Sequence, residues 1–286
     1  MAKKTTKKTI KKTIKKQTKK QSTKIKSPLL TPELDVNKSK PKKEKSFDNE
    51  LIKTGVPGLD EVLKGGLKKN LSVLLSGGPG TGKTILAMQF LLEGAKNGEP
   101  GLYMLYDNEE RFVEYAKSLV IDFEPFIKKG LIHILKQPII GMVSTLAEPI
   151  EIIKKKKIKR VVLDSLTMFS YVYINDEREY RKSIVKFLEN MKDVTLFATS
   201  ESSGATMDEL NFRAEDFLFD GVIFVAKIRQ EASFERVLHV SKMRGQNHLI
   251  DIYPLFIEQG GVTVYPDQLP FALIAQDNKK QTEKKK

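Results

Sequence analysis

From about Phe47 onward, short apolar runs alternate with longer segments in which apolar and polar positions are mixed. Each run is five or six residues long, is rich in branched or aromatic side chains and holds few charges. Such runs are typical of strands that are covered on both faces of a sheet. The predicted strands are Leu71–Ser76, Gly101–Tyr106, Leu131–Leu135, Arg160–Asp164 and Val194–Thr199.

The segments between these runs have the length of helices. Strands that alternate with such helices predict βαβ units and a mainly parallel sheet, so the expected fold class is α/β. In the first helix, apolar side chains cover most of the circumference, which is typical of a helix packed deep against a sheet. The predicted helices are Lys83–Lys96, Glu110–Val120, Ser144–Lys156 and Glu179–Met191.

Beyond Asp220 the pattern changes from strand and helix to strand followed by strand. We interpret this region as an antiparallel extension of the same sheet and not as a second domain. A turn at Gly245 separates its two halves. The predicted strands of the extension are Gly221–Ile228, Glu235–Met243, Ile250–Ile257 and Gly260–Val264.

The positive charge of the chain is concentrated at its N-terminus. The formal net charge is +14, and the first 45 residues alone hold 17 lysines against three acidic residues. The remaining chain is therefore formally neutral, which disfavours a basic nucleic-acid-binding face on the folded part. The lysine-rich stretch has too few apolar residues to offset its ordering entropy. We expect a disordered tail at residues 1–46, one folded domain at 47–270 and a second lysine-rich tail at 271–286.

The lysine-rich tail could attract phosphate backbones or anionic surfaces without sequence preference. It could equally be a solubility tail, because its composition fixes no partner. The chain has no cysteine, three scattered histidines and no stretch of eighteen apolar residues. These features predict no disulfide, no thiolate metal site and no membrane span, and they fit a cytoplasmic location.

A glycine-rich segment between the first predicted strand and helix matches the P-loop (Walker A) pattern in full. In such loops glycines let successive backbone N–H groups turn onto a polyphosphate, and the following helix N-terminus adds positive potential. Lys83 is expected to reach the β- and γ-phosphates of ATP, and the hydroxyl of Thr84 to ligate Mg²⁺. The predicted nucleotide-binding residues are Gly78, Pro79, Gly80, Thr81, Gly82, Lys83 and Thr84.

A carboxylate ends the apolar strand that begins at Arg160. Asp164 is placed as in P-loop proteins that hold Mg²⁺ through water with a strand-end aspartate. A strand-end aspartate can also cap the next turn, which is the alternative interpretation. The P-loop about eighty residues earlier favours the metal-binding role, so we expect Thr84 and Asp164 to share the Mg²⁺ site.

Several ordered blocks outside the loop resemble KaiC-type domains, the RecA-like ATPases related to the cyanobacterial clock protein and to RadA. The resemblance covers about residues 47–266 and implies one such domain, where the clock protein resembles two in tandem. It also implies a RecA-like fold that binds Mg²⁺ and ATP. The blocks are Thr54–Asp60, Gly65–Leu67, Gly77–Thr84, Val162–Thr167 and Lys242–His248.

The resemblance implies a ring, expected to be hexameric, in which one subunit completes the site of the next. Lys242, Arg244 and His248 would then reach the γ-phosphate of ATP bound to a neighbouring subunit. Cations there would stabilise charge that develops during phosphoryl transfer. Without the resemblance, this run would be a solvated strand edge and turn.

Several residues of this sequence are candidates for the one that orients the attacking water. Members of the family place two adjacent glutamates after the second strand, and alignment on that strand puts Asp107 and Asn108 there. Alignment on the following helix puts Tyr106 and Asp107 there, and the pair Glu109-Glu110 fits only with a gap. We rank Asp107 first and Glu109 second. The alternative is that the acidic run simply enriches a helix N-terminus in carboxylates, an interpretation that fits Glu110 equally well. Aspartate reaches about 1.5 Å less far than glutamate, so slow hydrolysis is expected.

The same resemblance leaves three functions open. The chain could be a slow ATPase whose nucleotide state controls ring conformation and a protein partner. It could be an ATP-binding scaffold with negligible turnover, like the motor-accessory protein FlaH, or a RadA-like ATPase acting on DNA. The segment Ala214–Asp216 stands where the phosphorylated clock domain has a Ser-Thr pair, which argues against autokinase activity.

Overall fold

The predicted strands come together as one sheet in the computed structural model. The structure describes residues 50–138, 147–173, 175–202, 213–230, 232–271 and 273–274. Within these residues the main sheet has the strand order β11-β10-β9-β8-β3-β7-β6-β4-β5. Its strands are β3 (Ser72–Gly77), β4 (Gly101–Leu105), β5 (Ile132–Lys136), β6 (Arg160–Asp164), β7 (Thr195–Glu201), β8 (Gly221–Gln230), β9 (Ser233–Met243), β10 (Ile252–Glu258) and β11 (Gly261–Val264).

The sheet has a parallel and an antiparallel part. Strand β3 lies between β7 and β8 and pairs with both in parallel, and β6, β4 and β5 continue the parallel part. Strands β8 to β11 pair antiparallel with one another. The predicted α/β class, with a C-terminal antiparallel extension, is therefore confirmed.

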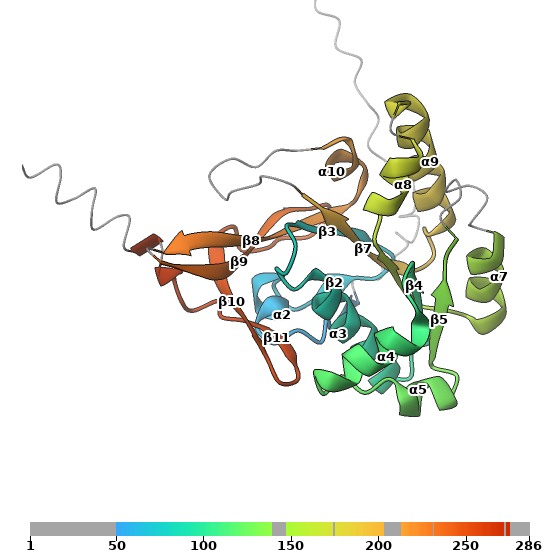
Figure 1. Ribbon diagram of the computed structural model, residues 1–286, viewed down its shortest axis with the longest axis horizontal. Coiled ribbons are helices and arrows are strands. Elements are labelled where there is room, and N and C mark those ends of the chain that lie inside the picture. Colours follow the sequence, from blue (N-terminus) through green and yellow to red (C-terminus); the bar gives the residue numbers. More distant parts are fainter. Residues whose placement is uncertain are drawn as a thin grey trace, which may run out of the picture. The chain divides into compact units, whose positions relative to one another are not determined.

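Helices cover both faces of the sheet, as the low charge of its strands requires. Figure 1 shows α3 and α4 on one face, with α8 and α9 on the other. The helices are α2 (Leu59–Val62), α3 (Lys83–Lys96), α4 (Glu109–Ser118), α5 (Glu124–Lys128), α7 (Ala147–Lys156), α8 (Thr167–Val172), α9 (Glu177–Asn190) and α10 (Ala214–Leu218). None of these helices is long and apolar enough to cross a membrane.

Two apolar cores form between the helices and the sheet. Alternation along β3 divides its side chains between them, with Val73 and Leu75 facing α3 and Leu74 facing the opposite side. On the α3 side, the rings of Phe90 and Phe197 stack with their centroids 4.1 Å apart. Ten of the fourteen residues of α3 are buried, as the apolar pattern around the whole helix predicted.

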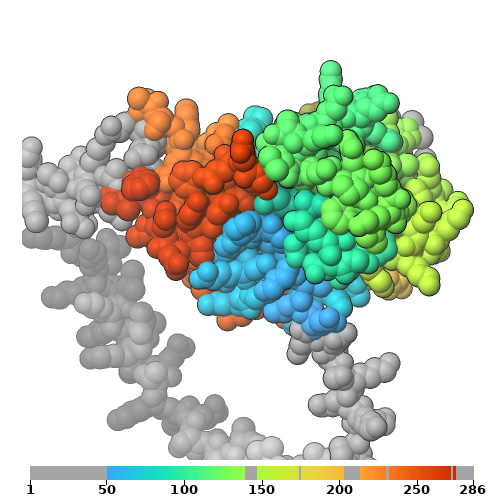
Figure 2. Space-filling model, turned by 90° about the horizontal axis from the view of Figure 1, so that it is seen from below, coloured from blue at the N-terminus to red at the C-terminus, as the bar shows by residue number. Residues whose placement is uncertain are grey.

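The first described residues form a small cover beside α3. Strand β1 (Leu51–Ile52) pairs antiparallel with β2 (Leu67–Lys68), and α2 lies between them in sequence. The amide of Gln89 in α3 donates to the carbonyl of Val262 at 3.0 Å, and its side-chain oxygen accepts from the N–H of the same residue at 2.8 Å. Figure 2 shows the blue N-terminal segment, teal α3 and the red C-terminal strands side by side.

The predicted tails fall largely outside the described residues. The tail at 1–46 lies entirely outside them, and of the tail at 271–286 only residues 271, 273 and 274 are described. The predicted helix Ser144–Lys156 is described from Ala147 onward. The short helices α2, α5, α8 and α10 were not predicted, because four to six residues are too few for a helical period to show.

Candidate functional site: a nucleotide-binding loop

The glycine-rich segment forms the connection between β3 and α3. Gly82 immediately precedes α3 with a φ of 105°, a conformation that residues with a Cβ rarely adopt. A Cβ on Gly77 would lie 2.0 Å from the carbonyl oxygen of Val225, so the loop can leave the sheet only because this side chain is missing. The hydroxyl of Thr81 donates to the carbonyl of Gly78 at 2.8 Å and closes the loop.

Lys83, the first residue of α3, folds back into the loop. Its Nζ donates to the carbonyl oxygens of Gly77 and Gly78, each at 2.8 Å. Burial lowers the pKa of Lys83, while the nearby carboxylates of Asp164 and Glu201 act in the opposite direction. An ammonium group that is partly desolvated at a helix N-terminus is well placed to receive an anion.

Asp164 accepts hydrogen bonds from three strands or helices at once. The hydroxyls of Thr84 and Tyr103 each donate to Oδ2 at 2.8 Å, and the hydroxyl of Thr199 donates to Oδ1. The site therefore brings Thr84 and Asp164 together as predicted. Their hydroxyl and carboxylate oxygens are hard ligands that suit Mg²⁺, either directly or through water.

Tyr103 is fully buried beneath Asp164. Burial, followed by the charge of Asp164, raises the pKa of Tyr103 well above its ordinary value, so the phenol stays a hydrogen-bond donor. This donor fixes one lobe of the carboxylate from below, and Thr199 fixes the other. The carboxylate of Asp164 is thus held from two sides, and Thr84 of the loop contacts it from a third.

Two adjoining cavities lie over the loop and share Thr84 and Tyr115. The cavity of about 450 Å³ is lined by Thr84, Leu105, Tyr106, Asp107, Arg111, Phe112, Tyr115, Asp164, Ser165 and Met168. The cavity of about 380 Å³ is lined by Gly80, Gly82, Lys83, Thr84, Ile85, Tyr115, Leu119, Arg236 and Ile257. Together they provide room for an elongated ligand whose phosphates rest on the loop.

The structure separates the two candidates for the residue that orients water. Asp107 follows β4 and lines the larger of these cavities together with Thr84 and Asp164. Glu109 begins α4, and its Oε1 accepts from the backbone N–H of Lys136 at 3.1 Å. Glu109 lines a different hollow, between α4, α5 and β5, so the structure brings Asp107 to the loop and does not bring Glu109 there.

The three predicted trans-acting residues lie away from the loop of their own subunit. Met243 pairs with Gly221, and Gly221 pairs with Val73 near the start of β3, whereas the loop follows the end of β3 at Gly77. Four residues of strand separate these levels, which is about 13 Å. Lys242, Arg244 and His248 thus line neither of the two cavities over the loop of their own chain.

Each of these three side chains contacts a nearby backbone carbonyl group. The Nζ of Lys242 donates to the carbonyl of Asp216 and the guanidinium of Arg244 to that of Phe217, both at 2.7 Å. Burial lowers the pKa of Lys242. The Nδ1 of His248 lies 2.9 Å from the carbonyl oxygen of Leu249.

Sequence reasoning missed several residues of the site. Tyr103 and Thr199 reach Asp164 from the strands on either side of β6. Arg236 donates from Nε to the carbonyl of Gly80 at 3.0 Å, and Lys227 approaches the same glycine. Only the strand order and the register of β8 against β9 could have placed these side chains at the loop.

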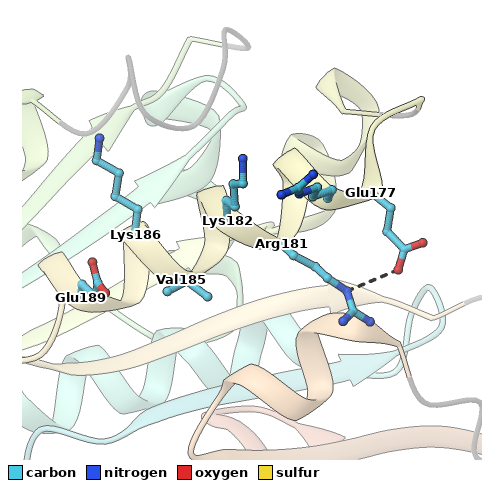
Figure 3. Close-up of a pocket in the computed structure, with 7 residues that line it drawn as sticks. Glu177, Arg181, Lys182, Val185, Lys186 and Glu189 are labelled. Atoms are coloured by element: carbon cyan, nitrogen blue, oxygen red, sulfur yellow. Dashed lines mark ion pairs between the residues drawn. The ribbon is translucent and has the colours of Figure 1, made fainter.

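A larger hollow, of about 760 Å³, lies on the outer face of α9. It is lined by residues of that helix alone, between Glu177 and Glu189. Figure 3 shows their side chains projecting from the helix, with Arg181 paired to Glu177 at 3.3 Å. Charges of both signs along an open helix face are typical of a solvated surface, and none of these residues contacts the loop.

Comparison with known proteins shows the family of this chain. The model of the family described as "ATPase: KaiC" matches residues 52–269. A UPF0273 protein of Pyrococcus horikoshii is 33% identical over 240 residues, which cover 76% of this chain and 95% of that protein. The circadian clock oscillator protein KaiC of Picosynechococcus sp. is 31% identical over 229 residues, which cover 75% of this chain and 44% of KaiC.

A solved structure resembles this fold, and nearly all of that structure's chain is matched. It is the crystal structure of a KaiC-like protein from the hyperthermophilic archaeon Pyrococcus horikoshii OT3. The TM-score is 0.67 at 31% sequence identity, and the match covers 76% of this chain and 99% of the other.

Proposed function

The chain belongs to the KaiC family of ATPases, and from this premise we propose that it binds Mg²⁺ and ATP at the loop Gly77–Thr84 and hydrolyses ATP slowly. The observation that carries the proposal is the contact between Thr84 and Asp164 at 2.8 Å, beside the ammonium group of Lys83. Hard oxygen ligands next to a desolvated cation suit a metal-bound polyphosphate.

The residues divide the work of binding among them. The backbone of the loop and the N-terminus of α3 receive the phosphates, and Lys83 turns from the carbonyls of Gly77 and Gly78 to the β- and γ-phosphates. Thr84 and Asp164 hold the metal ion, which neutralises phosphate charge when it is bound. Tyr103 keeps Asp164 in place from beneath.

Hydrolysis requires a group that orients water, and Asp107 is the better placed of the two candidates for this role. It lines the same cavity as Thr84 and Asp164, and its Oδ1 accepts from the N–H of Asn108 at 2.8 Å. That bond holds one carboxylate oxygen close to the backbone and leaves the other to contact water. A short side chain held in this way favours slow in-line attack.

Completion of the site by a neighbour is the second part of the proposal. The positive charges of Lys242 and Arg244 lie at the edge of the sheet where β3 begins, about 13 Å along the strands from the loop of their own chain. In a closed head-to-tail ring, that edge can face the loop of the next subunit. We therefore assign Lys242, Arg244 and His248 to the γ-phosphate of ATP bound to the next subunit, and we expect the ring to be a hexamer.

A binding scaffold with negligible turnover is the second candidate. The observation that favours it is the anchoring of Asp107 to its own backbone, which restricts the reach of the best-placed acid. In that case ATP would stabilise one conformation for a protein partner without being consumed. A DNA-acting ATPase is disfavoured, because the chain beyond the lysine-rich tail is formally neutral.

Calorimetric titration with Mg²⁺ and ATP tests the binding proposal, and a phosphate-release assay tests turnover. Lys83→Ala is expected to weaken binding about 30-fold or more, because a charge-assisted contact is lost. Lys96→Ala, at the exposed far end of α3, is the matched control and should bind as wild type does. If Lys83→Ala bound equally well, ATP binding at the loop would be refuted. If wild type bound ATP but turned over no faster than Lys83→Ala, the scaffold function would replace the ATPase.

A further inference from the structure

Two cations from the antiparallel extension converge on one glycine of the loop. The Nε of Arg236 donates to the carbonyl of Gly80 at 3.0 Å. The Nζ of Lys227 lies 2.9 Å from the position that a Cβ on Gly80 would occupy. Neither residue belongs to the loop, and both come from the same chain as the loop.

The register of the sheet explains how they reach the loop. Strand β8 runs parallel to β3 and pairs with its last residue, Gly77, through Val225. It then continues past the end of β3, so that Lys227 stands beside the loop. Val225 faces α3, and the two-residue period of a strand directs Lys227 to that same face.

Lys227 and Arg236 are direct partners across β8 and β9, so their side chains share one face. Like charges directly opposite each other destabilise a sheet. Lys83 adds a third positive charge close by, and the charge of Lys227 acts to lower the pKa of Lys83. In the part of the chain that the structure describes, no hydrogen bond or ion pair joins Lys227 to an acidic group.

Three cations around one loop are an unfavourable arrangement until an anion joins them. We propose that Lys227 is a further phosphate-binding residue, which acts in cis on the polyphosphate above Gly80, with Arg236 as the positioning residue that fixes the loop beneath it. This inference rests on the proposed binding of ATP at the loop. It adds a cation from β8 to the charges that the P-loop pattern supplies.

The substitution Lys227→Gln tests the inference, because it removes the charge and keeps most of the side chain. It is expected to weaken the binding of Mg²⁺ with ATP about tenfold, the size of a lost charge-assisted contact. The binding of inorganic tripolyphosphate should weaken in parallel, since the lysine reads phosphate and not the base. Lys227→Arg should retain most of the affinity.

The stability of the protein without nucleotide provides a second measurement, which should rise in Lys227→Gln while the affinity for ATP falls. Lys227→Gln relieves the repulsion with Arg236, so the melting temperature of the free protein should rise by about 1–2 °C. The rise in melting temperature on adding ATP should become smaller. A residue with a merely structural role would instead lower the melting temperature with and without ATP.

Lys186→Gln is the matched control, because it makes the same change on the outer face of α9 (Figure 3), and Lys186 lines neither of the cavities over the loop. Wild-type affinity in Lys227→Gln, or an equal loss in both variants, would overturn the inference. So would a loss of ATP binding with unchanged tripolyphosphate binding. Full ATP binding by Lys83→Ala would instead refute the underlying function, which separates the two failures.

Discussion

The hydroxyl of Thr84 donates a hydrogen bond of 2.8 Å to the carboxylate of Asp164, although the two residues are 80 positions apart in the chain. Thr84 is the second residue of α3 and the last residue of the glycine-rich loop, and Asp164 ends β6. Strand β7 separates β6 from β3 in the sheet, so the pair spans an intervening strand. In the proposed function, this contact joins the residues assigned to the phosphates to the carboxylate assigned to the metal ion.

Replacing Asp164 by asparagine should uncouple metal binding from nucleotide binding. The amide keeps the size of the side chain and loses the charge that attracts Mg²⁺. We expect the affinity for ATP with Mg²⁺ to fall by about 2 kcal/mol, or about 30-fold. Calorimetric titrations with Mg²⁺ and with EDTA measure the difference between the two conditions.

The matched control for that experiment is Tyr103→Phe, which removes one hydrogen bond to Asp164 and keeps the charge. Its effect on Mg²⁺-dependent binding should be much smaller, because Thr84 and Thr199 still orient the carboxylate. An Asp164→Asn variant whose ATP affinity responded to Mg²⁺ as wild type does would show that the metal is held elsewhere.

A second prediction concerns turnover. Asp107→Asn should lower the rate of ATP hydrolysis about 100-fold, the lower end of what a positioned general base contributes. Glu109→Gln should leave the rate within about twofold of wild type, since its side chain faces β5 and surface changes of this kind are small. Glutamine also keeps an oxygen that can accept from the N–H of Lys136.

Single-turnover phosphate release at saturating ATP checks both variants, so that a change in affinity does not obscure the chemical step. Equal rates for Asp107→Asn and wild type would remove Asp107 from the mechanism. A large loss in Glu109→Gln would return that residue to the site and imply that α4 moves when nucleotide binds.

The contrast between Asp107 and Glu109 shows where the sequence alone falls short. The loop was predictable because its residues are adjacent in the chain and their spacing carries the chemistry. At the junction of β4 and α4, a shift of one or two residues exchanges one acid for another. In the structure, the side chain of Asn108 caps α4 by accepting from the N–H of Arg111 at 2.9 Å, which places Asp107 before the helix and Glu109 in its first turn.

The other residues that were missed depend on contacts between distant segments. Tyr103 and Thr199 look like ordinary strand residues, and only the order β7-β6-β4 brings both to Asp164. Lys227 and Arg236 fall in the predicted strands Gly221–Ile228 and Glu235–Met243, and nothing in their local pattern marks them as site residues. Their role depends on how far β8 extends beyond β3, which is a property of strand register and not of local pattern.

A third prediction follows from the separation of Arg244 and the loop within one chain. Arg244→Ala and Lys83→Ala should each lower hydrolysis about 100-fold or more, because each removes a cation from the γ-phosphate. Mixing the two variants should restore activity. A Lys83-containing subunit would then receive Arg244 from its neighbour, and roughly a quarter of the interfaces in an equimolar ring would be intact.

The mixture should be assayed after the subunits have exchanged, with native mass measured with and without Mg²⁺ and ATP. Arg244→Lys serves as control, because it keeps a positive charge but loses the planar fork of the guanidinium. A mixture no more active than its two components would contradict action across the interface. So would a monomeric protein that hydrolyses ATP at the rate of the assembled form.

A fourth prediction uses the buried acids of α10, which lies between the segment after β7 and the start of β8. Glu215 and Asp216 are both buried, and desolvation raises the pKa of each above its ordinary value. The groups that face Glu215 are Arg213 at 3.8 Å, whose charge partly opposes the rise, and Asp216, whose charge adds to it. Tyr180 from α9 also faces this cluster, and burial, followed by the charge of Glu215, raises its pKa.

The sign of the pH effect follows from that rise. A raised pKa in the folded state adds stability below the unfolded pKa of Glu215, 4.5, and this contribution is lost as pH rises through the folded pKa. Glu215→Gln has no such loss, so its free energy of unfolding relative to wild type should increase with pH just above 4.5. Urea denaturation at pH 4.5 and pH 7 measures this, with the exposed Glu177→Gln as control. A difference that stayed constant with pH would mean that the charge of Arg213 balances desolvation, and one that decreased would mean that α10 favours the charged carboxylate; either result would contradict the prediction.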